Sequence, residues 1–172
     1  MPSEVPTGWR LMAVRSAAKL RMGETIVAKN LTGDGIPVYS AGRATEPWGF
    51  TSASKKRFRR GTVVVGARGT LGYPRLPDHE VFVSTQTTIA ASPTEGLIPE
   101  YLCSALGGLD YSVLGAQQAV PMLTVDALGS ARILVPPLPE QKKIAAILSS
   151  VDEAVEATQA VIQQTRRVKE GL

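Results

Sequence analysis

The sequence predicts an α+β fold, in which a mixed domain of short strands and short helices precedes one long, protruding C-terminal helix. Residues 1–139 are rich in Gly and Pro, with short apolar runs between turn residues, whereas no Pro and only Gly171 follow Glu140. After Glu140 the apolar residues recur at alternating spacings of four and three, which is typical of a pairing helix. We therefore expect one domain over residues 1–139 and a helix over residues 140–172.

Short runs of apolar and β-branched residues, bounded by turn residues, predict the strands of the first domain. They lie at residues 36–39, 61–66, 81–83, 87–90 and 132–135. The strand over residues 61–66 is the clearest, because three valines stand between two glycines. Pro37 cannot donate a backbone hydrogen bond, so its strand is predicted at a sheet edge. Ser92 and Pro93 predict a turn after residue 90.

Two short helices and one capped turn are predicted in the same domain. One helix is expected over residues 16–20. A second is expected over residues 99–106, because Pro99 stands at its start and two glycines follow its end. Thr124 is predicted to cap a short helical turn that runs through Leu128.

The C-terminal helix carries an apolar seam with heptad spacing. Its members are Ile144, Leu148, Val151, Val155, Thr158, Ile162, Thr165, Lys169 and Leu172, and Ile147, Ala154, Val161 and Val168 form an adjacent stripe. At about 1.5 Å per residue the helix would be roughly 50 Å long. A domain of this size cannot cover such a stripe, so we expect the helix to protrude and to pair with another helix. The alternative is that it folds back across its own domain.

Composition sets broad limits on function. The formal net charge is +4 and the sequence pI is about 9.4, which is compatible with a polyanionic partner. The single cysteine, Cys103, excludes an internal disulfide and a cysteine-based zinc site, and it is expected to be buried in a helix. The first residues do not resemble a signal peptide, and no apolar run is long enough to span a membrane. A cytoplasmic location is expected.

Several segments, in order, resemble one half of a type I restriction–modification specificity (S) subunit. They include Gly8-Trp9-Arg10, residues 35–42, residues 61–72 with their glycine turn, and residues 123–128. The most specific is the run Pro136-Pro137-Leu138-Pro139-Glu140-Gln141, which leads from a strand into the long helix. The resemblance spans nearly the whole chain.

Members of that family usually carry two target recognition domains separated by two long conserved helices, whereas this chain has one of each. It is either a half-length subunit or a fragment of a longer chain. The resemblance implies binding of double-stranded DNA, with methyltransferase (M) and restriction (R) subunits as partners. It also implies pairing of the C-terminal helix, in a homodimer or with a second recognition half. An identical partner chain would predict a palindromic, bipartite target.

The candidate DNA-binding residues are polar or basic and lie in predicted loops. They are Arg43, Thr45, Lys55, Lys56, Arg57, Arg59, Arg60, Arg68, Gln86, Gln117 and Gln118. Five cations around Phe58 could contact several phosphates, and arginine can also bind guanine edges. Arg68 has a second interpretation, in which it bonds carbonyls of its own glycine-rich turn. The glutamines could each bind adenine, although glutamine is also common on protein surfaces.

No set of residues for catalysis is recognised. The Asn/Asp-Pro-Pro-aromatic motif of DNA methyltransferases is missing, and no Glu-x-Lys follows Asp78 and Glu80, as a metal-dependent nuclease would require. The single histidine, His79, is predicted to be a turn residue. The chain is therefore predicted to be non-catalytic, with no cofactor or metal of its own. The alternative function is an oligomerisation module that uses the helix and does not bind DNA.

Overall fold

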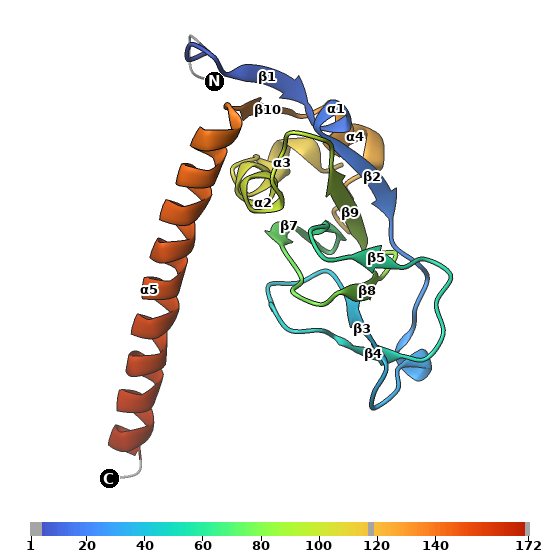
Figure 1. Cartoon of the computed structure of the whole chain (residues 1–172). Coiled ribbons are helices and arrows are strands. Elements are labelled where there is room, and N and C mark those ends of the chain that lie inside the picture. The colour runs from blue at the N-terminus through green and yellow to red at the C-terminus, as the bar shows by residue number, and fades with distance from the viewer. Residues whose placement is uncertain (1–4, 117–118, 171–172) are drawn as a thin grey trace.

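The fold class is confirmed in a computed structural model, which describes residues 5–116 and 119–170. A strand-rich domain with short helices is followed by one long helix, α5 (Leu138–Glu170), which projects from the domain (Figure 1). In the described part of the domain there are two four-stranded sheets and a small two-stranded sheet. The small sheet pairs β1 (Arg10–Ala13) with β10 (Arg132–Val135), so the first strand lies beside the last.

The first four-stranded sheet is antiparallel, and its central strands are buried on both faces. Its order is β2 (Ala18–Met22), β9 (Thr88–Pro93), β6 (Val63–Arg68) and β7 (Thr70–Arg75). Val63 and Val65 belong to the main core under the helices, whereas Val64 belongs to a second core against the other sheet. A strand covered on both faces must be apolar at consecutive positions, which accounts for the three valines.

The second four-stranded sheet has the order β4 (Gly49–Thr51), β3 (Ile36–Tyr39), β8 (Val81–Ser84) and β5 (Phe58–Arg59). The prediction that Pro37 marks an edge strand is wrong, because β3 lies between β4 and β8. Pro37 is tolerated there because the parallel pairing with β8 begins only at Val38.

The helices of the domain are α1 (Val14–Ala17), α2 (Pro99–Gly107), α3 (Tyr111–Leu114) and α4 (Val125–Ser130), with a 3₁₀ turn, η1, at Ala28–Asn30. The prediction for residues 99–106 is confirmed. The cap is confirmed as well, since the hydroxyl of Thr124 accepts a hydrogen bond from the backbone N–H of Ala127 at 3.0 Å.

Two local predictions are wrong for the same reason. The helix expected over residues 16–20 begins at Val14 and ends at Ala17, and the turn expected at Ser92 and Pro93 is a continuation of β9. In the structure Ala18 pairs with Pro93 and Lys19 with Ser92, so β2 and β9 extend along each other. Pairing between distant segments outweighs the local preferences of these residues.

The start of α5 is joined firmly to the domain. The Gln141 side chain is 1% exposed, and its amide nitrogen donates to the backbone oxygens of Gly96, at 2.9 Å, and Pro136, at 3.0 Å. Next to it, the indole N–H of Trp9 donates to the Glu140 carboxylate at 2.8 Å. The Pro-Glu-Gln run therefore connects the helix to the domain physically.

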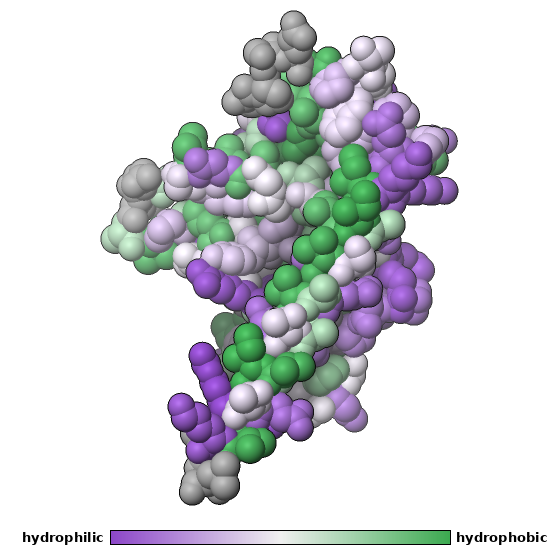
Figure 2. Space-filling view, turned by 90° about the vertical axis from the view of Figure 1, so that its left-hand side faces the viewer, coloured by the Kyte–Doolittle hydropathy of each residue, from purple (hydrophilic) through white to green (hydrophobic). Residues whose placement is uncertain are grey.

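Beyond this first part, the apolar seam of α5 faces solvent. Ile144 packs on the main core, but the seam residues Val151 and Val155 are 52% and 48% exposed. Figure 2 shows apolar side chains recurring along the helix, with paler residues between them. The fold-back alternative fails because the helix does not bury its stripe on its own domain. Leu172, the last predicted seam residue, lies outside the described residues. No helix in the described ranges is long and apolar enough to cross a membrane.

Candidate nucleic-acid interface

The turn at residues 85–87, which joins β8 to β9, is the point where the two large sheets meet. The backbone oxygen of Thr87 accepts hydrogen bonds from the N–H groups of Ala67, at 2.7 Å, and Arg68, at 3.1 Å. The Thr87 hydroxyl accepts from the backbone N–H of Ala41 at 3.2 Å and is bonded to the Ser40 hydroxyl. The end of β6 and the loop after β3 are therefore both attached to one residue.

The end of β2 is attached to the same turn. The backbone N–H of Gln86 donates to the carbonyl of Glu24 at 2.8 Å, and the Gln86 side-chain oxygen accepts from the N–H of Ile26 at 3.1 Å. Gly23 lies so close to the turn that a β-carbon there would be 2.1 Å from the Thr85 carbonyl oxygen. Only glycine fits this approach of two backbones.

The Glu24 carboxylate also fixes the start of the basic run. One of its oxygens accepts hydrogen bonds from the backbone N–H groups of Lys55 and Lys56, both at 2.9 Å, and from the Ser54 hydroxyl at 2.8 Å. These bonds, led by that from Lys56, lower the pKa of Glu24. We call residues 40–45, 54–57, 67–69 and 85–87 the turn cluster, because hydrogen bonds to residues 85–87 or to Glu24 hold them together.

Several of the predicted DNA-binding side chains are exposed on the turn cluster. They are Arg43, Thr45, Lys55, Arg57 and Arg68. Lys56 differs, because its ammonium group donates to the backbone oxygens of Met22, at 3.3 Å, and Gly23, at 3.4 Å. Lys56 is thus half-buried and used within the domain.

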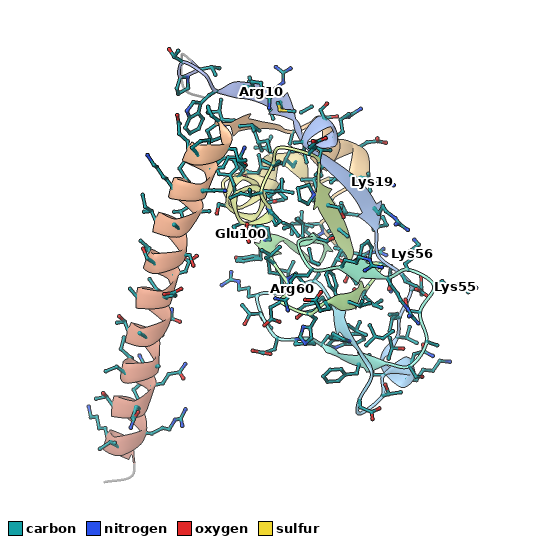
Figure 3. The ribbon with its side chains drawn as sticks, in the orientation of Figure 1. Arg10, Lys19, Lys55, Lys56, Arg60 and Glu100 are labelled. Carbon is teal, nitrogen blue, oxygen red and sulfur yellow. The ribbon has the colours of Figure 1, made fainter. Side chains whose placement is uncertain are left out.

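The basic run at residues 55–60 does not form a single loop. Phe58 and Arg59 form β5, where Phe58 is 4% exposed and packs against Phe82 with ring centroids 5.8 Å apart. Arg60 lies at the far end of β5 from Lys55 and Lys56 (Figure 3), and its guanidinium bonds the Glu80 carboxylate at 2.9 Å. Because β5 lies between them, Lys55 and Arg60 stand at opposite ends of this strand.

The remaining predicted residues have different surroundings. Arg68 is exposed, and among the described residues its guanidinium bonds none of the carbonyls of its turn, which leaves it accessible to a partner. The Gln86 carboxamide is half-buried and its oxygen is already bonded to Ile26. Gln117 and Gln118 lie outside the described residues, although Ala116 and Met122 on either side are bridged to each other, and Met122 also to Arg68.

His79 and Cys103 contribute to the fold. His79 Nδ1 is hydrogen-bonded to the Tyr39 hydroxyl at 2.9 Å. Cys103 is half-buried in α2, where burial raises the pKa of its thiol to about 11. Within residues 5–116 and 119–170, no group of three or more His, Cys, Asp or Glu side chains could hold a metal ion.

Sequence reasoning missed the residues that assemble the turn cluster. Glu24, Ser40 and Thr87 have no motif around them, and their partners on other segments lie between 19 and 62 residues away along the chain. The one available indication was the polar run Ser84-Thr85-Gln86-Thr87-Thr88 between two apolar strands. It marks a polar turn but does not identify the segments that contact it.

A sequence model of the type I restriction modification DNA specificity domain family matches residues 6–166. The chain belongs to this family. The domain of that description recognises DNA sequence in restriction–modification systems, which agrees with the resemblance of the Pro-Pro-Leu-Pro-Glu-Gln segment.

Solved structures share the fold. A chain from a study of complex assembly and conformational transition of the type I R-M system is 23% identical, with a TM-score of 0.78 over 95% of this chain. The HsdS subunit from Thermoanaerobacter tengcongensis is 23% identical, with a TM-score of 0.73 over 91% of this chain. The S subunit from M. genitalium is 21% identical, with a TM-score of 0.72 over 97% of this chain. This chain covers 43%, 41% and 45% of those three chains. It therefore spans less than half the length of each of them.

Proposed function

We propose that this specificity domain recognises its DNA through the turn cluster, as the recognition half of a type I restriction–modification complex. Residues 1–139 would act as the target recognition domain and residues 140–172 as the spacer and pairing helix. The observation that carries this proposal is the exposure of Arg43, Lys55, Arg57 and Arg68 on three segments that are attached to residues 85–87 or to Glu24. Glu24 and Thr87 hold these segments in place before any ligand is bound.

The side chains of the turn cluster suit the two kinds of contact that DNA requires. Lysine neutralises phosphates and so positions a protein on the duplex, whereas arginine can bind both acceptors of guanine in the major groove. Arg43 and Arg68 stand on turns, from which a side chain can enter a groove. Arg60 is a weaker candidate because it is paired with Glu80 at the other end of β5.

The helix suits a different role in the same assembly. An exposed apolar stripe of this length is stabilised when a second helix covers it. Pairing with an identical chain, or with the second half of a longer chain, would hold two recognition domains apart and give a bipartite DNA site. In this arrangement the methyltransferase and restriction subunits supply the chemistry, with their own S-adenosylmethionine and ATP, and this chain supplies none.

The first test is DNA binding by the whole chain. Duplexes are selected from a randomised pool, and the affinity of the selected duplex is measured by fluorescence anisotropy between about 50 and 200 mM salt. Sequence-specific recognition predicts a selected consensus and a logarithm of the binding constant that falls linearly with the logarithm of salt concentration. Neither a consensus nor a salt dependence is expected if the chain is only an oligomerisation module, for which light scattering would still show association.

A further inference from the structure

Arg75, on β7, binds the backbone of the loop that follows β3. One guanidinium nitrogen donates to the backbone oxygens of Gly42, at 3.3 Å, and Ala44, at 2.5 Å, and the other donates to the backbone oxygen of Ser40. Three carbonyls at alternate positions of one loop therefore converge on one side chain. Neither the sequence nor the family resemblance drew attention to this arginine.

The rest of the Arg75 environment keeps the guanidinium at this position. It lies over the Tyr39 ring, 5.7 Å from the centroid, and the Tyr39 hydroxyl is held by His79. Among the described residues no carboxylate forms an ion pair with Arg75; its two terminal nitrogens bond loop carbonyls and its face lies over an aromatic ring, while its buried Nε has no hydrogen-bond partner. An arginine with this set of partners stabilises one conformation of the loop.

Tyr73 supports the same loop two residues earlier on β7. The Arg43 guanidinium lies 4.7 Å from the centroid of the Tyr73 ring. Tyr73 has a φ of +49°, which is uncommon for a residue other than glycine. Within the loop itself, Gly42 has a φ of +149°, so the bend there requires glycine. β7 thus holds the loop backbone through Arg75 and the Arg43 side chain through Tyr73.

We propose that Arg75 is a positioning residue for DNA recognition, which fixes residues 40–44 so that Arg43 and Thr45 are presented to DNA in one arrangement. The inference rests on the proposed function and identifies how part of the turn cluster is preorganised. A loop that is ordered before binding loses less conformational entropy when it docks, and the gain appears as affinity. Arg75 itself does not need to touch the DNA.

The loop can be observed directly, without DNA, through Trp48. The sequence has two tryptophans, so Trp9→Phe leaves Trp48 as the single reporter. Trp48 follows the loop, is 45% exposed, and donates its backbone N–H to the Val38 carbonyl at 2.7 Å. In this background Arg75→Met is expected to raise the acrylamide quenching constant of Trp48, and Arg75→Lys to raise it less. Unchanged quenching in both variants would overturn the proposal.

DNA binding by the full chain completes the test. Arg75→Met is expected to weaken binding of the selected duplex by about tenfold, whereas Arg10→Met, an exposed arginine on β1, should leave it unchanged. If Arg75 acts through Arg43, the loss should shrink strongly in an Arg43→Ala background. An equal loss in both backgrounds would contradict positioning. If the wild-type chain selects no duplex, the proposed function fails; if it selects one and Arg75→Met binds equally well, only this inference fails.

Discussion

The side chain of Gln141, on the first turn of α5, accepts a hydrogen bond from the backbone N–H of Ile98 at 3.0 Å. Its amide nitrogen donates to two further backbone oxygens, so one buried carboxamide satisfies three backbone groups from two segments. Buried polar groups that lose their partners cost free energy, so these bonds hold the helix in a fixed direction. The position of α5 relative to the turn cluster is therefore set by the fold.

Replacing Gln141 with methionine keeps the side-chain volume but removes all three hydrogen bonds. We expect Gln141→Met to lower the free energy of unfolding by about 2–4 kcal/mol, because buried backbone groups are left unpaired. Urea denaturation followed by circular dichroism measures this change. Gln159→Met is the matched control, since Gln159 is exposed on the same helix. Equal stabilities of the two variants would show that the carboxamide does not hold the junction.

The sequence predicts the elements whose cause is local. The β-branched residues of β6, the proline and glycines around α2, the hydroxyl of Thr124 and the heptads of α5 each predict their element correctly. Prediction from the sequence fails where pairing with a distant segment determines the secondary structure. Ala18 and Lys19 are strand residues because β9 extends beside them, and β3 is central because β8 pairs with it from Val38 onward.

The candidate site shows the same division. Residue type predicts Arg43, Lys55, Arg57 and Arg68 as candidates, and all four side chains are exposed in the structure. It could not show that Lys56 bonds carbonyls at the end of β2, because that contact spans more than 30 residues. Nor could it separate Lys55 from Arg60, since that separation follows from the short strand β5 between them.

A negative charge in the helix seam should prevent pairing. We expect the wild-type chain to have twice its 18.3 kDa mass in light scattering, because the seam needs a partner. Val155→Glu together with Ile162→Glu should give the monomer mass, since both side chains lie within the exposed stripe. Gln163→Glu adds one charge on the exposed face opposite the seam and should leave the mass unchanged. A monomeric wild-type chain would instead indicate that the partner helix belongs to a longer chain.

The two ends of the basic run should contribute differently to DNA binding. Replacing Lys55 and Arg57 together with alanine is expected to make the slope of log binding constant against log salt concentration less steep by roughly two units. Each phosphate contact contributes about 0.9 to that slope. Arg60→Ala should change the slope little, because Arg60 is paired with Glu80 at the other end of β5. Anisotropy titrations at four salt concentrations compare the variants. An equal effect of Arg60→Ala would place the DNA across both ends of β5.

The close approach of Gly23 to residues 84 and 85 should be essential to the turn cluster. A β-carbon at Gly23 would lie 2.1 Å and 2.3 Å from the backbone oxygens of Thr85 and Ser84, neither of which can move as a side chain would. We expect Gly23→Ala to cost at least about 1–3 kcal/mol of unfolding free energy. Gly33→Ala is the control, because no atom lies within 4 Å of its β-carbon position.

DNA binding by these two variants extends the same comparison. Because Gly23 precedes Glu24, a shift at Gly23 would displace the carboxylate that holds Lys55 and Lys56. The Gly23→Ala variant should therefore lose affinity at a temperature where circular dichroism shows it still folded, while Gly33→Ala binds like the wild type. A folded Gly23→Ala variant with unchanged affinity would mean that the DNA contacts do not depend on the join between β2 and residues 85–87.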